Sequence, residues 1–227
     1  MKKAPHISRV HLLYIISLLA TALSIMPCTS VMAQKAGTVI TVKPAEEGSY
    51  FYSQPIPDDI FARMQGKSFP KNCTTKRSDL RYLRVLHVNK EGNTQVGEMV
   101  CHKSISADLI DIFRKLYDAR YPIERMVLID DYDANDDRSM AANNTTCFNF
   151  RFITGSTTRV SKHGMDMAVD LNPYDNPYVK GNIVKPKGAK RTPEITKNSL
   201  PYRLFTKHGF RWGGSWKSLK DYQHFEK

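Results

Sequence analysis

Residues 161–173 read SKHGMDMAVDLNP, and residues 221–226, close to the end of the chain, read DYQHFE. The first stretch contains His163 and Asp170, and the second begins with an aspartate and contains His224. Two imidazoles, one carboxylate ligand and a spare carboxylate are the inventory of a catalytic zinc site, which needs three protein ligands, an open position for water and a base. If the two stretches meet in space, their residue types indicate a hydrolase.

The spacing within each stretch restricts where these residues lie. In a continuous strand, His163 and Asp170 would point to opposite faces because they are seven residues apart. Gly164 relieves this restriction, since His163 can lie on a loop while Asp170 projects from the strand behind it. Asp221 and His224 are three apart and share a cavity only if Asp221 lies on the turn before the strand that carries His224. Both pairs are therefore predicted at loop-to-strand junctions.

Taken together, the two stretches resemble the zinc D-alanyl-D-alanine metallopeptidases. That family includes the VanX and VanY dipeptidases and carboxypeptidases and the L-alanyl-D-glutamate endopeptidases of phage endolysins. Its hallmark, Ser-x-His-x6-Asp followed by an acid-x-x-His, is present in the right order, with a Trp-Gly-Gly turn before the second motif. The resemblance covers about residues 50–227, including the string that ends at Arg151. It implies an α+β fold of the hedgehog and D-Ala-D-Ala metallopeptidase type.

Carried over residue by residue, the resemblance implies that His163, Asp170 and His224 bind zinc (Zn2+). Asp221 is implied to be the general base for a zinc-activated water. Arg151 is implied to face the scissile carbonyl, where a guanidinium supplies positive charge and a rigid fork of donors.

Three other positions near the motifs bear on this comparison. Ser161, two residues before a ligand, is expected to support the loop of His163 rather than to act as a nucleophile. Asp166 stands where the family usually has Gly, and Ser215 stands where endolysins often have Asp. These departures concern the fine geometry of the site and not its ligands.

The N-terminal segment has the pattern of an export signal. Basic residues precede an almost unbroken apolar run over residues 12–26, and small residues end the segment at Ala33. The run is shorter than the roughly 20 residues of a spanning helix, so no stable membrane anchor is expected. We interpret residues 1–33 as a signal peptide, 34–50 as a linker and 51–227 as one zinc peptidase catalytic domain.

The charge balance and the family together suggest the substrate. Loss of the signal peptide removes three basic residues and no acid, so the net charge falls from +12 to +9. An exported basic protein is expected to meet an anionic envelope polymer rather than nucleic acid, although a merely solvated basic surface is an equal alternative. Many of the lysines lie between Lys180 and Lys197, in a loop that has the composition of a flexible segment.

The expected function is therefore that of a monomeric peptidase in the periplasm, cell envelope or extracellular space. It would hydrolyse stem peptides of peptidoglycan as an L-alanyl-D-glutamate endopeptidase or a D-Ala-D-Ala carboxypeptidase. Two alternatives remain open at this point. One is a catalytically inactive peptidoglycan-binding module on the same zinc fold, and the other is a basic adhesion protein whose histidines are structural.

Periodicity and turn chemistry predict an α+β fold, with a small, mostly antiparallel sheet and helices packed on one side. Helices are expected over residues 57–64, from Ser104 to before Pro122, and over 199–208, and a β-hairpin is expected over 81–101. Further strands are expected over residues 125–130, 146–153, 165–171 and 222–226.

Three smaller features carry their own expectations. An oxidising compartment would permit one disulfide, for which Cys73 with Cys101 is the favoured pair, and Cys147 would then be a buried small hydrophobe. The acidic loop over residues 130–137 does not match the spacing of a calcium-binding loop and is expected to be solvated. Aromatic residues alternate along residues 146–153, so one face is expected in the core while the other, with Arg151, faces polar groups.

Overall fold

The computed structural model of the protein describes residues 34–152, 160–161, 163–165 and 167–227. The predicted signal peptide and Asp166 lie outside the described residues. Within the described part, helices and small antiparallel sheets combine into an α+β fold, as predicted. None of the helices described is long and apolar enough to cross a membrane.

The N-terminal half is built on one β-hairpin. Strands β2 (Leu80–Val88) and β3 (Thr94–His102) pair antiparallel along their whole length, which confirms the predicted hairpin. Asn89 closes the loop between them, because its Oδ1 accepts two backbone N–H hydrogen bonds from within the loop. The short strand β1 (Tyr52–Gln54) completes the sheet in the order β1-β2-β3. A single-turn 3-10 helix, η1 (Glu47–Tyr50), precedes β1, and a second one, η2 (Arg77–Asp79), precedes β2.

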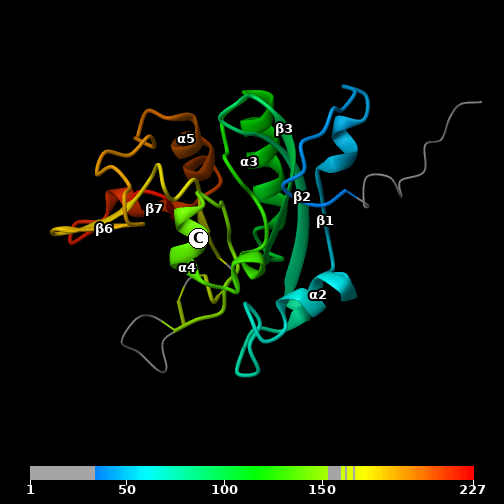
Figure 1. Ribbon diagram of the computed structural model, residues 1–227, viewed down its shortest axis with the longest axis horizontal. Helices are drawn as coiled ribbons and strands as arrows, with labels where there is room; N and C mark the ends of the chain where they lie inside the picture. The colour runs from blue at the N-terminus through cyan, green and yellow to red at the C-terminus, as the bar shows by residue number, and fades with distance from the viewer. Residues whose placement is uncertain (1–33, 153–159, 162, 166) are drawn as a thin grey trace, which may run out of the picture.

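Two helices cover this sheet. Helix α3 (Ser106–Asp118) lies along the β2–β3 hairpin (Figure 1), with Leu109, Ile112 and Leu116 fully buried on one face. Helix α2 (Asp58–Met64) lies at one end of the same sheet. Residues 34–50 run beside β3, and the backbone N–H groups of Gly37 and Ile40 donate hydrogen bonds to carbonyl groups of β3.

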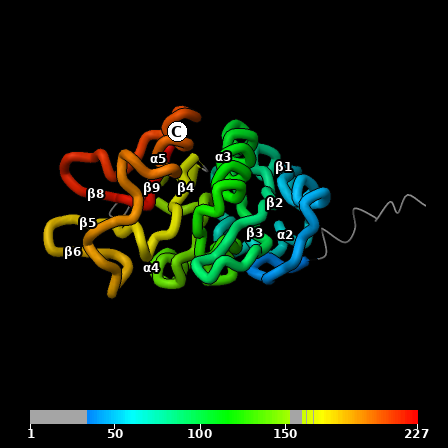
Figure 2. Tube along the Cα trace, turned by 90° about the horizontal axis from the view of Figure 1, so that it is seen from above, coloured from blue at the N-terminus to red at the C-terminus, as the bar shows by residue number. Residues whose placement is uncertain are grey.

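The C-terminal half contains two more three-stranded sheets. One has the order β4-β9-β7, formed by β4 (Ala168–Asp170), β9 (His224–Glu226) and β7 (Arg211–Trp212). The other has the order β6-β5-β8, formed by β6 (Ile183–Lys185), β5 (Tyr178–Lys180) and β8 (Lys220–Asp221). Figure 2 shows the β5, β6 and β8 strands on one side of α3 and the β1-β2-β3 sheet on the other. A single sheet was predicted, whereas the described residues form three.

The remaining elements connect these sheets. Helix α5 (Leu200–Lys207) confirms the helix predicted before Gly209, and helix α4 (Asp136–Ala141) follows the acidic loop. Two further 3-10 turns are η3 (Ile129–Tyr132) and η4 (Gly213–Ser215), which precedes β8.

Two predicted strands do not join a sheet, and the last two residues of the first, 129–130, belong to η3 instead. Within residues 125–130, the side chain of Asn144 binds both backbone polar groups of Val127. The Oδ1 of Asn144 accepts a hydrogen bond from the N–H of Val127, and its Nδ2 donates one to the carbonyl of Val127. An asparagine side chain therefore replaces a neighbouring strand.

The second such segment covers residues 146–153, of which Ile153 lies outside the described part. Phe148, Asn149 and Phe150 donate their backbone N–H groups to Val100, His163 and Ser68 in turn. Thr146 forms a further isolated bridge with Asp170, and because all these partners lie in different segments, no ladder forms. Alternation still holds: Phe148 and Phe150 are buried in one hydrophobic cluster, with Phe152 packed against it.

The main hydrophobic core joins the two halves of the molecule. It contains one face of α3 together with residues of β2, β3, β4, β9 and α5. Phe205 of α5 and Phe225 of β9 stack at its centre, with ring centroids 4.2 Å apart and an interplanar angle of 15°. Cys101 and Cys147 are buried in this core, and the predicted pairing of Cys73 with Cys101 stays a prediction. Because β9 carries His224, the core fixes one end of the candidate site.

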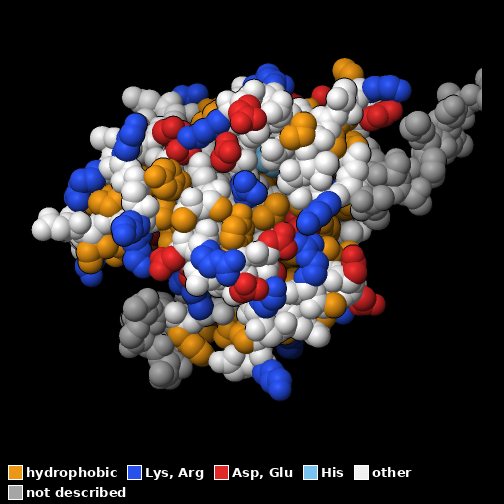
Figure 3. All heavy atoms as spheres, viewed as in Figure 1, with side chains coloured by type: hydrophobic (Ala, Val, Ile, Leu, Met, Phe, Trp, Pro, Cys, Tyr) orange, Lys and Arg blue, Asp and Glu red, His pale blue; other side chains and the backbone are white. Residues whose placement is uncertain are grey.

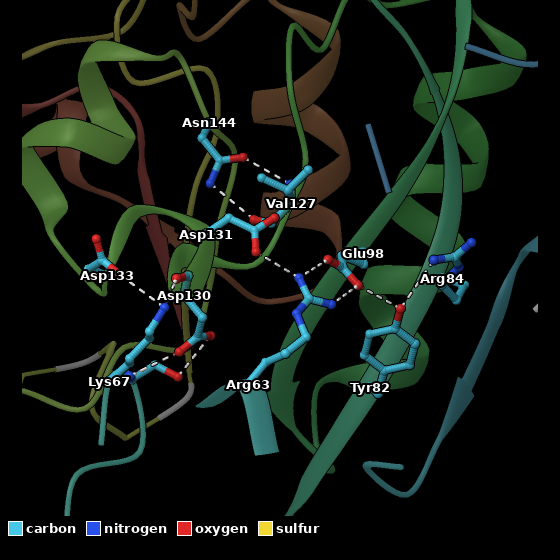
Figure 4. Close-up of polar contacts among 11 residues, drawn as sticks. Arg63, Lys67, Tyr82, Arg84, Glu98, Val127, Asp130, Asp131, Asp133 and Asn144 are labelled. Atoms are coloured by element: carbon cyan, nitrogen blue, oxygen red, sulfur yellow. Dashed lines mark hydrogen bonds and ion pairs between the residues drawn. The ribbon is translucent and has the colours of Figure 1, made fainter. Parts of the chain in front are cut away.

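A buried polar network holds α2 to the sheet (Figure 4). The carboxylate of Glu98 accepts hydrogen bonds from both terminal nitrogens of Arg63, at 3.2 and 2.8 Å, and from the hydroxyl of Tyr82 at 2.7 Å. Arg63 also binds Asp131 at 2.9 Å, and buried Asp130 accepts two hydrogen bonds from Ser68. Asp130 and Asp131 thus anchor the start of the acidic loop, while the side chains of Asp133 and Asp137 are 63% and 70% exposed, as expected of a solvated loop.

Candidate metal centre and active site

The loop that carries His163 is held from two sides. Ser161 donates its backbone N–H to the carbonyl of Arg151 at 2.9 Å, and its Oγ accepts the backbone N–H of Gly164 at 3.0 Å. Ser161 is buried, and its hydroxyl lies within this turn. The Nδ1 of His163 lies 2.8 Å from the carbonyl oxygen of Cys147, so a proton on Nδ1 leaves Nε2 as the lone-pair donor.

Asp170 and His224 come together through the register of two strands. Asp170 of β4 lies directly opposite His224 of β9, and directly opposite residues of an antiparallel pair project from the same face. This pairing brings the two sequence stretches into contact, and it places His163 on a loop and Asp170 on the strand behind it, as the spacing predicted. Asp221 is the last residue of its own short strand, β8, rather than part of a turn. Two residues separate it from the start of β9.

Three donor atoms form a compact triangle. Nε2 of His163 lies 3.2 Å from Oδ1 of Asp170 and 3.3 Å from Nδ1 of His224, and the last two atoms are 3.1 Å apart. Ligands bound tetrahedrally at zinc distances of about 2.0–2.2 Å are separated by about 3.3 Å. The two histidines and the aspartate therefore fit zinc in both chemistry and spacing.

The charges around the triangle also favour a cation. Burial opposes ionisation of Asp170, but His163 and His224 hold its pKa well below the usual range. Burial would likewise lower the pKa of His224, yet hydrogen bonds to Asp170 and Glu226 raise that pKa to about 10. A histidine that is driven to bind a proton among carboxylates lies where a metal ion would replace that proton.

A carboxylate and an indole contact the imidazole of His224 outside the donor triangle. Its Nε2 lies 3.4 Å from Oε2 of Glu226, and Arg211 donates to the other oxygen of that carboxylate at 2.7 Å. The indole of Trp216 lies against the imidazole, with ring centroids 5.2 Å apart. A carboxylate on the far nitrogen of a metal-binding histidine fixes its tautomer and orientation.

Asp221 lies beside the triangle. Burial and the nearby charge of Asp170 raise the pKa of its carboxyl group to about 6. Gln223 donates to its Oδ1 at 3.0 Å. A Cβ atom at Gly213 would lie only 2.6 Å from the carbonyl oxygen of Asp221 and 3.2 Å from the Cβ of His224, so the Trp-Gly-Gly turn packs directly on both residues.

Arg151 is held by an acid from helix α4. Its Nε lies 2.6 Å from Oδ2 of Asp136, whose Oδ1 accepts a hydrogen bond from Asn149 at 3.0 Å. Asn149 and Arg151 of the 146–153 segment therefore face polar groups, whereas Cys147 of the same segment is buried in the main hydrophobic core. The structure brings His163, Asp170 and His224 together with Asp221 beside them, and the contact it shows for the Arg151 side chain is with Asp136.

Sequence reasoning missed two residues of this arrangement. Asp136 was assigned to a solvated loop, and nothing in the local pattern connects it to Arg151. Glu226 carries a signal in retrospect, because it lies two residues from His224 and would share its strand face.

Comparison with known proteins agrees with this geometry. Residues 154–227 match the sequence profile of the D-alanyl-D-alanine carboxypeptidase family. No curated protein and no solved structure matches the chain significantly. The matched segment contains all three residues of the donor triangle and Asp221. This C-terminal third of the chain is therefore similar to the D-alanyl-D-alanine carboxypeptidase family of peptidases.

Proposed function

We propose that the protein is an exported zinc metallopeptidase that hydrolyses peptide bonds in the stem peptides of peptidoglycan. The observation that carries the proposal is the triangle of His163, Asp170 and His224, with donor atoms 3.1–3.3 Å apart and Asp221 beside it. The family of residues 154–227 supports a peptidase that acts on peptides of this kind.

When bound to the three donors, zinc supplies a Lewis acid that lowers the pKa of water to about 7. Asp221 performs the proton transfers. Burial and the charge of Asp170 raise the pKa of Asp221 to about 6 before any metal binds, and a carboxylate beside the three donors can accept a proton from the attacking water. The same carboxyl group then returns that proton to the nitrogen of the leaving amine.

Arg151 orients the substrate. A guanidinium has five N–H donors, and Asp136 engages one edge of it, at Nε. The remaining donors serve the carbonyl oxygen of the scissile bond, where negative charge develops during attack. Asp136 restricts the rotation of the side chain, so less conformational freedom is lost when substrate binds.

The proposals of export and of a peptidoglycan substrate are based on the sequence. The basic start, the apolar run and the small residues up to Ala33 support a signal peptide that delivers the protein to the periplasm or cell envelope. Peptidoglycan lies in that compartment. We infer a monomer without a stable membrane anchor and without a nucleic-acid partner. The Asp-x-x-His form of the last motif favours the L-alanyl-D-glutamate bond, whereas the family description favours the D-Ala-D-Ala bond.

Mass spectrometry of purified muropeptides incubated with zinc-loaded protein tests this proposal and distinguishes the two bonds. Loss of a terminal D-alanine identifies a carboxypeptidase, and release of stem peptides that begin with D-glutamate identifies the endopeptidase. Elemental analysis is expected to find about one zinc per chain. Retained zinc without any cleavage would instead indicate an inactive binding module.

A further inference from the structure

The lysine-rich segment that follows β5 is built onto the candidate active site. Residues 178–185 form the β5–β6 hairpin, which sequence analysis treated as part of a flexible loop. Tyr178 of β5 lies directly opposite Asp221 of β8, so the hairpin extends from the strand that carries the proposed base. Figures 1 and 2 show it at the edge of the molecule, away from the β1-β2-β3 sheet.

This segment concentrates positive charge. Residues 180–197 contain six basic side chains and a single acid, Glu194. All six are exposed: Lys180, Lys185, Lys187, Lys190, Arg191 and Lys197. In the described part of the chain, only Lys185 of these six pairs with an acid, Asp137, at 3.2 Å. Figure 3 shows Lys and Arg side chains along the edge where β6 lies, with hydrophobic side chains between them.

Internal contacts hold these charges in place. Arg191 donates to the carbonyl of Gly181 at 2.9 Å, which ties the second half of the segment to the hairpin turn. The hydroxyl of Tyr174 donates to the carbonyl of Gly188 at 3.0 Å. At the far end, Ile195 is fully buried in the main core. The basic groups therefore project from a fixed surface rather than from a free tail.

We propose that the basic hairpin surface, residues 180–191, binds the anionic polymer whose stem peptides the active site cleaves. This inference rests on the proposed function, because it assigns that polymer as peptidoglycan. Stem peptides carry free carboxylates, and a long polyanion placed over several fixed cations is held by their summed attraction. Since β5 pairs with β8, polymer bound at the hairpin lies next to Asp221.

A membrane surface is the competing partner for a basic patch. Ile183, 55% exposed near the hairpin turn, is the large apolar side chain available for insertion there. A single isoleucine buries far less apolar surface than a myristoyl chain, which itself gives only marginal binding to a bilayer. The position of the hairpin beside Asp221 therefore favours the polymer.

The test compares two charge-matched double variants of the full chain. Lys187→Glu with Lys190→Glu reverses two charges of the basic hairpin surface. Lys35→Glu with Lys43→Glu reverses two exposed charges on the N-terminal segment, which lies beside β3 at the opposite side of the molecule. Co-sedimentation with purified insoluble peptidoglycan is measured at low and high salt, together with hydrolysis of that polymer and of a short soluble stem peptide.

The hairpin variant is expected to bind the polymer about tenfold more weakly at low salt and to lose most of its salt dependence. Its hydrolysis of the polymer should fall in parallel, while its kcat/KM for the short peptide stays within about twofold of the unmodified protein. The control variant should match the unmodified protein in all three assays. Equal polymer binding by both variants would overturn the inference.

Two further outcomes separate this inference from its alternatives. Stronger binding of the unmodified protein to vesicles containing phosphatidylglycerol than to peptidoglycan, lost in the hairpin variant, would overturn the polymer as partner. If no peptide is cleaved by the zinc-loaded protein, the proposed function fails, and co-sedimentation still decides whether the hairpin binds the polymer.

Discussion

The Nε atom of Arg151 lies 2.6 Å from Oδ2 of Asp136, so an acid at the start of helix α4 holds the cation proposed to face the substrate. Asn149 binds the other oxygen of the same carboxylate, which fixes Asp136 in turn. The two residues are 15 positions apart in the sequence, and their contact depends on how the acidic loop folds onto the 146–153 segment.

Replacing Asp136 by Asn should therefore impair catalysis without affecting the metal. Loss of the ion pair frees the guanidinium to rotate, and we expect kcat/KM to fall by about 10- to 100-fold, the scale on which misplaced groups reduce enzymatic rates. Zinc content should be unchanged. The matched control is Asp137→Asn, because Asp137 is 70% exposed and pairs only with surface Lys185 among the described residues. Equal kcat/KM for both variants would show that Asp136 does not position Arg151.

Glu226 should tune the affinity for metal through His224. Its carboxylate lies 3.4 Å from Nε2 of His224, opposite the nitrogen that faces the donor triangle. In Glu226→Gln the negative charge behind the imidazole is lost, and we expect zinc affinity to fall by about 10- to 100-fold. Competition with a chelator of known affinity measures the change. An unchanged zinc affinity would mean that this contact has no part in metal binding.

Gly213 should tolerate no side chain. A Cβ atom there would lie 2.6 Å from the carbonyl oxygen of Asp221, closer than real contacts allow, and that backbone cannot yield without moving Asp221. Gly213→Ala is expected to reduce kcat by at least about tenfold. Gly48→Ala is the control, since nothing lies within 4 Å of a Cβ at that position. Full activity in the Gly213 variant would contradict the packing of η4 on the site.

Buried His87 should make the protein less stable in acid. Burial lowers the pKa of His87 to about 4, although Nδ1 lies 2.7 Å from the carbonyl oxygen of Ile123. The unfolded chain binds a proton below about pH 6.5 while the native state does not, so the free energy of unfolding falls as the pH drops from 6.5 to 4, by about 3 kcal/mol in total.

Urea unfolding of the unmodified protein and of His87→Gln at pH 7, 6, 5 and 4 isolates this contribution. The difference between the two free energies should be largest at pH 7 and should shrink toward pH 4. A difference that does not change with pH would show that His87 titrates alike in both states.

The part of the site that sequence could predict lies in two short motifs. His163, Asp170 and His224 were predictable because their residue types and spacing carry the chemistry, and strand parity restricted where they lie. The hairpin of β2 and β3 and the long helix α3 were predictable because their apolar residues follow the period of each element.

The rest depends on contacts between distant segments. Residues 125–130 and 146–153 have strand-like sequences, yet side chains and separate partners satisfy the described backbone of these segments, and no local pattern reveals this. The β5–β6 hairpin was hidden by its Lys, Gly and Pro content, because its order comes from pairing with β8 and from buried Ile195. The basic residues that pair with the acidic loop could not be predicted for the same reason, because Arg63, Lys67 and Arg151 lie elsewhere in the chain.

The central claim is that Asp221 performs proton transfer beside a zinc ion held by three other residues. It is tested most directly by measuring the hydrolysis of purified muropeptides by zinc-loaded Asp221→Asn and unmodified protein, with zinc content determined on the same samples. We predict that the variant retains about one zinc per chain and that its kcat falls by about 100- to 10,000-fold, the usual contribution of a general base. Turnover by the zinc-loaded variant at the rate of the unmodified protein would contradict the account.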